Sequence, residues 1–172
     1  MASERERDRK KGESTCLQLL FSFTVLLSEI NSILEKYCST IASIVNEHLN
    51  WAIVYDMSSI GFVLNICHIL FSREECFYCH ELSTLLSIAS LLHSYLFQRS
   101  DSSDSFEDKD YVEAIQCLIL FWSCAPLVLP RSEIPGVLAG YFSFLEAPKR
   151  IPVTLRSSFL ASLRRSLQLF PD

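Results

Sequence analysis

The sequence predicts an all-α fold, and two observations lead to that class. The 172-residue chain holds only 4 glycines and 6 prolines, fewer turn-forming residues than a protein of many short strands needs. Hydrophobic residues make up 49% of the chain, and most of them recur three or four positions apart, which is the period of one helix face. A chain of this length buries about 70% of its unfolded surface, so we expect one hydrophobic core.

The first elements are a charged tail and a long helix. Residues 1–13 mix acids and bases without an apolar period, which predicts a disordered tail ahead of a single helical domain over 14–172. A seam of alternating three- and four-residue spacings then predicts one amphipathic helix, or two nearly collinear ones, over 15–49. The seam consists of Leu20, Phe23, Leu27, Ile30, Leu34, Tyr37, Ile41 and Ile44. Its flanking residues are mostly apolar or neutral, so we expect several neighbouring helices.

Two more helices and a loop are expected next. One helix runs over 52–71. Another runs over 72–97, and its first residue, a serine, is followed three positions later by a glutamate, as in a capping box. Residues 98–110 then form a flexible, acidic and serine-rich loop, in which Ser105 is a candidate phosphorylation site.

Prolines and capping residues mark three further helices. A fourth helix over 110–124 is ended by Pro126 and Pro130, a fifth covers 133–146, and a sixth begins near Pro152. About six helices with mostly short connectors favour an irregular bundle. At the level of helix pairs the pattern also resembles an armadillo- or HEAT-like helical stack, although no fixed sequence repeat accompanies it.

Charge and cysteine usage narrow the environment. The net charge of −5 argues against a nucleic-acid partner, because such partners need a basic face. The seven cysteines are odd in number and lie mostly within apolar helical runs, which indicates reduced core thiols rather than disulfides. We therefore expect an intracellular protein of the cytoplasm or nucleus.

A multi-pass integral membrane protein is the main alternative. Uncharged runs lie near 14–28, 57–72, 82–98 and 114–130. None exceeds 17 residues, whereas a span needs about 20. Basic residues gather near both ends of the chain, which suits four short spans, but polar stripes along the first three runs favour packed helices.

A zinc-stabilised helical domain is a second alternative. Side chains of the kinds that bind zinc lie close together in the sequence at Cys67, His68, Cys76, Cys79 and His80. Three ligands from one continuous helix seldom converge on a tetrahedral ion, so we expect no metal and no other cofactor.

No motif indicates catalysis. The four histidines are scattered over predicted helices, and the chain has neither a glycine-rich phosphate loop nor a GxSxG elbow. The favoured hypothesis is thus a non-enzymatic interaction or scaffold module that binds another protein, and such a module also suits a larger helical assembly. The aromatic residues expected to serve an interface are Phe121, Trp122, Tyr141, Phe142 and Phe144.

The C-terminal helix is the predicted partner-binding segment. Apolar residues alternate there with arginines, a pattern suited to a groove on a protein partner or to an anionic membrane surface. The predicted contact residues are Leu155, Arg156, Phe159, Leu163, Arg164, Arg165 and Leu167.

Overall fold

The computed structural model describes residues 15–26, 31–55, 57–78, 82–99, 108–146 and 151–169. These residues form seven α-helices and no strand, so the predicted all-α class is confirmed. The predicted tail, Ser105 with most of the acidic loop, Cys79 and His80 lie outside the described residues.

The helices follow one another through short connections. In chain order they are the helix Thr15–Leu26, α2 (Asn31–Tyr55), α3 (Ile60–Phe71), α4 (Leu82–Arg99), α5 (Lys109–Val128), α6 (Ile134–Glu146) and α7 (Arg156–Leu169). Short 3-10 segments precede four of them: Met57–Ser59, Glu74–Phe77, Arg131–Glu133 and Val153–Leu155.

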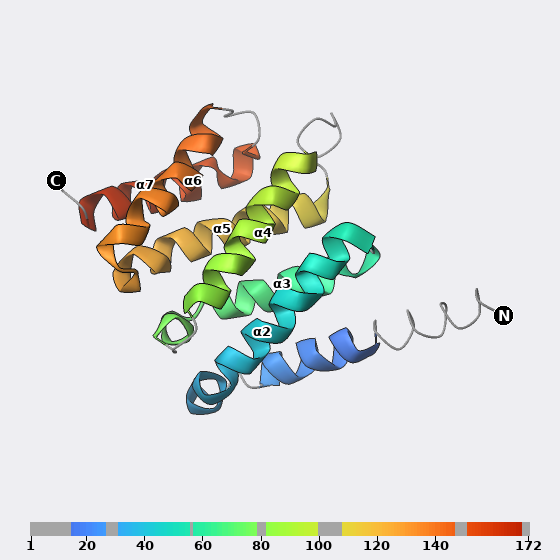
Figure 1. Cartoon of the computed structure of the whole chain (residues 1–172). Coiled ribbons are helices and arrows are strands. Elements are labelled where there is room, and N and C mark those ends of the chain that lie inside the picture. Colours follow the sequence, from blue (N-terminus) through green and yellow to red (C-terminus); the bar gives the residue numbers. More distant parts are fainter. Residues whose placement is uncertain are drawn as a thin grey trace.

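Successive helix pairs stack on one another in two layers (Figure 1). In one layer α2 packs against α4, and α4 meets α6 through a 2.9 Å hydrogen bond between His93 and Ser143. In the other layer α3 packs against α5, and α5 packs against α7. Contacts between α2 and α3 and between α4 and α5 join the layers. The core therefore runs along the interface of the two layers, with α5 at its centre.

The predicted continuous helix over 15–49 is wrong. The rings of Phe23 and Tyr37 lie 6.4 Å apart, whereas 14 residues of uninterrupted helix would separate them by about 21 Å. The chain therefore turns back between Thr15–Leu26 and α2, and two nearly collinear helices are excluded as well. Beyond the predicted end, α2 continues to Tyr55, so residues 52–55 belong to it and not to the next helix.

The predicted helix over 72–97 is also wrong at its start. Ser72 ends α3, since its backbone N–H donates to the His68 carbonyl and its hydroxyl donates to the Ile69 carbonyl. The capping-box spacing was misleading because the serine already serves the preceding helix. The following helix, α4, begins only at Leu82.

Helix α5 continues through Pro126, the first of the two prolines predicted to end it, and stops at Val128, two residues before the second, Pro130. A proline has no N–H, so the carbonyl of Trp122, four residues earlier, loses its helical donor. The hydroxyl of Ser166 in α7 donates to that carbonyl at 3.2 Å and replaces the missing bond. At the other end, the cap is Asp108, whose carboxylate accepts from the N–H of Asp110 at 2.9 Å. A contact with a neighbouring helix thus satisfies the carbonyl that the proline leaves without a donor.

One helix in the described part of the chain, α5, is long and apolar enough to cross a membrane. Of its most apolar window, 56% is buried against other helices, as in the central helix of a packed core. The apolar helices Thr15–Leu26 and Ile60–Phe71 are shorter than a span. The four-span alternative therefore retains a single candidate span and stays a prediction.

Candidate functional site

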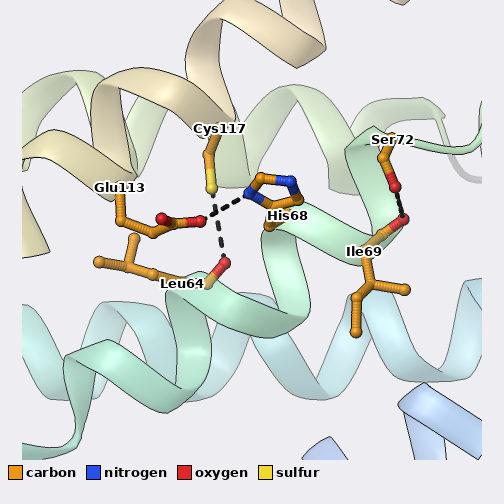
Figure 2. A network of polar contacts seen from close by, with 6 residues as sticks. All are labelled: Leu64, His68, Ile69, Ser72, Glu113 and Cys117. Atoms are coloured by element: carbon orange, nitrogen blue, oxygen red, sulfur yellow. Dashed lines mark hydrogen bonds and ion pairs between the residues drawn. The ribbon is translucent and has the colours of Figure 1, made fainter. Parts of the chain in front are cut away.

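Three side chains with metal-binding and acid–base chemistry meet between α3 and α5 (Figure 2). His68 of α3 places Nδ1 2.6 Å from Oε1 of Glu113 on α5, and Cys117 lies one helical turn beyond Glu113. The three ligand atoms lie within 4.8 Å of one another. The side chains of His68 and Glu113 are 34% and 23% exposed, so one side of the cluster is open to solvent.

Helix packing brings this cluster together. Residues four apart on a helix share a face, so Glu113 and Cys117 both project from α5 toward α3. The Cys117 thiol donates a hydrogen bond to the Leu64 carbonyl at 3.4 Å, one turn before His68 on α3. The ion pair and the thiol bond together tie α3 to α5.

The Cys117 thiol is not an activated nucleophile. Burial raises its pKa well above the ordinary value, and the neighbouring Cys67 and Glu113 raise the pKa further through like charge. The same desolvation raises the pKa of Cys67. Catalysis by a cysteine–histidine pair needs a readily formed thiolate, so the proximity of His68 and Cys117 does not indicate that chemistry.

Among the described residues, the three candidates predicted as zinc ligands do not assemble as a set, and the other two, Cys79 and His80, lie outside the described residues. Of the five, His68 belongs to the cluster, whereas Cys67 and Cys76 are buried in the core outside it. The carbonyl of Cys76 accepts a bond from the Cys38 thiol at 3.6 Å. Sequence reasoning missed Glu113 and Cys117, although their spacing of four was a usable signal.

A second candidate site is the outward side of α7. Phe159 and Leu163 are buried in the core, and Leu155 is partly buried, so these three predicted contact residues serve the fold. The remaining four, Arg156, Arg164, Arg165 and Leu167, are exposed. Leu160 is exposed too. We call Leu160, Arg164 and Leu167 the α7 stripe.

Two buried serines lie on the side of α7 that faces the core. Ser162 is buried and bonds to the hydroxyls of Tyr141 and Ser123. One turn later, buried Ser166 bonds to the Trp122 carbonyl and to Tyr141. Because these serines take core positions, the leucines of the α7 stripe point to solvent.

Tyr141 adds a pH-sensitive group to this contact. Burial raises the pKa of its hydroxyl above the ordinary tyrosine value, although the hydrogen bonds shared with Ser162 and Ser166 oppose the shift. The folded protein therefore favours the neutral phenol more than the unfolded chain does. The resulting stabilisation is present below the unfolded pKa and is lost as the pH rises through the folded pKa.

The α7 stripe borders a shallow hollow of 340 Å³. Its lining residues are Leu160, Leu163, Arg164, Leu167 and Gln168. The surrounding charge is positive, since α7 carries three arginines and no acid. Arg165 approaches Glu74 at 3.8 Å, and Arg156 donates to the Ile151 carbonyl. Within the described residues Arg164 has no ion-pair partner, which leaves its charge available.

The predicted interface aromatics serve the core instead. Phe121, Trp122, Tyr141 and Phe144 are buried, and only Phe142 of the five is exposed. The expectation of an aromatic interface is therefore wrong for four residues. The Trp122 ring packs against those of Tyr141 and Phe144, and the Tyr141 ring also meets Phe159 of α7. The Phe121 ring packs against Phe71 of α3 and against Phe77, so the same aromatic character stabilises the helix stack.

Small residues on α6 leave a cleft of 350 Å³ between α4 and α6. A Cβ added at Gly136 would meet nothing within 4 Å, whereas one at Gly140 would lie 3.0 Å from the Trp122 ring. Helix α6 thus lies close to α5 at Gly140, whereas Gly136 faces open space. Its lining comprises Leu86, Ala89, Ser90, His93, Leu118, Phe121, Trp122, Glu133, Gly136, Val137, Ala139, Gly140 and Ser143.

Comparison with known proteins assigns neither a family nor a function: no protein-family model, curated protein or solved structure matches the chain. The function is accordingly inferred from residues and contacts alone.

Proposed function

We propose that this protein is a non-enzymatic helical interaction module that binds an acidic amphipathic helix of another protein along the α7 stripe. One observation carries the proposal. After α7 has buried its docking face against α5, Leu160 is still 55% exposed and Leu167 45% exposed, with Arg164 between them. The core does not use these residues, so their apolar surface is available to a partner.

The spacing of the α7 stripe favours a helical partner. Its residues lie at positions i, i+4 and i+7 of one helix, and the 340 Å³ hollow beside them is large enough for an apolar side chain. A second helix laid along α7 would place its own apolar row against this stripe. The three arginines, with no acid on α7, favour a partner whose flanking residues are acidic.

An anionic membrane surface fits this helix less well than a protein does. Helices that lie on membranes insert a broad apolar face among the lipid chains. In α7 the broad face, which includes Phe159 and Leu163, packs against the core. Only the narrow stripe is left, and this width suits a single partner helix.

Site-specific photo-crosslinking tests the proposal. A photoreactive amino acid placed at Leu167 of the full chain in cells is expected to form an adduct with an acidic, amphipathic segment of one protein. The matched control position is Ser158, which is exposed on the far side of the same helix and should not give that adduct. Arg164→Glu should abolish the adduct, because it reverses the available charge.

Several results would count against the proposal. Equal adducts from Leu167 and Ser158 would mean that the surface is not selective. If the adducts survive Arg164→Glu, the partner segment is not recognised through acidic residues. Binding of the purified protein to anionic vesicles, lost on Arg164→Glu, would assign the stripe to a membrane instead.

A further inference from the structure

We infer that His68, Glu113 and Cys117 form a binding site for zinc or a chemically similar transition-metal ion. This inference goes beyond the interaction proposed for α7 and does not depend on it. The three ligand atoms lie within 4.8 Å of one another. Ligands of a tetrahedral zinc ion lie about 3.3–3.7 Å apart, given metal–ligand distances near 2.0–2.3 Å. Side-chain shifts of about 1 Å therefore suffice to close the site.

Two helices supply the ligands, which removes the obstacle to a site on one helix. His68 comes from α3, and Glu113 and Cys117 come from adjacent turns of α5. The α3–α5 contact belongs to the centre of the fold, so the backbone positions are held by packing on both helices. A metal ion needs only the side chains to move.

The ligand types select the ion. Imidazole and thiolate ligands favour zinc and its neighbours, whereas magnesium and calcium prefer oxygen ligands throughout. A dication bound by one carboxylate, one thiolate and one neutral imidazole has no net charge, so the complex avoids an unpaired charge in a partly buried place. The exposed sides of His68 and Glu113 leave room for water as a fourth ligand.

Metal binding must break two interactions: the contact between His68 and Glu113, and the hydrogen bond that the Cys117 thiol donates to Leu64. The ion takes the place of the hydrogen between Nδ1 of His68 and Oε1 of Glu113. In a neutral imidazole that proton moves to Nε2, and any second proton on the His68–Glu113 pair is released to solvent. The Cys117 thiol gives up its bond to the Leu64 carbonyl and releases its proton to solvent. The dication compensates for both losses, because coordination deprotonates a thiol outright.

Titration of the metal-free full chain with cobalt(II) tests this inference. Cobalt replaces zinc in such sites and gives a sulfur-to-metal charge-transfer band that reports thiolate coordination. We expect one equivalent to produce this band, and zinc to remove it by displacement. Cys117→Ser should eliminate the band, while its hydroxyl can still donate to Leu64. Glu113→Gln should weaken binding at least about 100-fold, more than loss of an outer-shell partner does, while its amide can still pair with His68.

The control is Cys124→Ser, which removes a thiol from the same helix two turns away and should leave the band unchanged. Three results would each overturn the inference: no charge-transfer band in the wild type, a band retained in Cys117→Ser, or full affinity in Glu113→Gln. Circular dichroism of each variant establishes that the helices are intact. Because Glu113 is partly exposed, its variant keeps the test decisive even where Cys117→Ser unfolds.

Discussion

The bond between Ser166 and the Trp122 carbonyl gives the sharpest test of how α7 holds α5. Pro126 leaves this carbonyl without a helical donor, and the Ser166 hydroxyl supplies one from the neighbouring helix at 3.2 Å. Ser166→Ala removes that donor from a buried position. A buried acceptor left without a partner costs about 1–3 kcal/mol, so we expect the free energy of unfolding to fall by that amount.

A second substitution isolates the bond. Pro126→Ala restores an N–H that can donate to the Trp122 carbonyl within α5, so the carbonyl no longer depends on α7. In that background Ser166→Ala should cost about 1 kcal/mol less, a coupling energy typical of residues that share a partner. Other consequences of Pro126→Ala, such as the change in chain entropy, cancel in the double-mutant cycle.

Equilibrium urea unfolding of the wild type, both single variants and the double variant measures this coupling. Far-UV circular dichroism follows the helices, and Ser158→Ala on the exposed side of α7 is the matched control. The control should cost the same in both proline backgrounds. If Ser166→Ala also costs the same in both, within about 0.3 kcal/mol, the bond does not replace the one that proline removes.

Three further predictions concern the α5–α6–α7 contact. Gly136→Ala should stabilise the protein by about 0.5–1 kcal/mol, because the added Cβ faces open space. Gly140→Ala should be neutral or destabilising by up to about 2 kcal/mol, because its Cβ would press against the Trp122 ring. Equal shifts of the melting temperature in the two variants would contradict this expectation. The free energy of unfolding should fall as the pH rises above about 10, and less steeply in Tyr141→Phe; parallel pH profiles would exclude Tyr141 as a contributor. Phe159→Ala should cost about 3–5 kcal/mol in urea unfolding, and a cost below about 1 kcal/mol would mean that α7 is not docked through this ring.

Helix content was predictable because it depends on local pattern. The spacing of apolar residues located most of the helical sequence, and α6 begins and ends within one residue of the predicted 133–146. A boundary was wrong where a residue suited to start one helix instead ends the helix before it. Ser72 fits the start of a helix by spacing, but its hydroxyl bonds to the end of α3.

Features that depend on long-range contacts were beyond the sequence pattern. Pro126 predicts a helix end, yet α5 continues to Val128, and the Trp122 carbonyl that the proline leaves without a helical donor is bonded by the Ser166 hydroxyl, 44 positions away in the chain. The helical pattern likewise does not show which apolar residues of α7 face the core, because Ser162 and Ser166 take core positions through their hydrogen bonds.

The candidate sites, too, were predictable only where they depend on local pattern and not on long-range contacts. Cys67, His68 and Cys76 attracted attention because they are close in sequence, but His68 meets Glu113 from 45 positions away. No local rule gives the register between α3 and α5 that brings the two together. Conversely, Arg164 and Leu167 were predicted as contact residues from the helical pattern alone, and both are exposed.

The affinity of a charge-swapped complex tests the proposed function most directly. Once crosslinking has identified the partner segment, its dissociation constant is measured for the wild type, for Arg164→Glu, and for Arg164→Glu with the facing acidic residue changed to lysine. We predict that Arg164→Glu weakens binding and that the compensating change restores it, because the two charges face each other across the α7 stripe. Equal affinity for all three combinations would contradict the account and would place the partner elsewhere on the molecule.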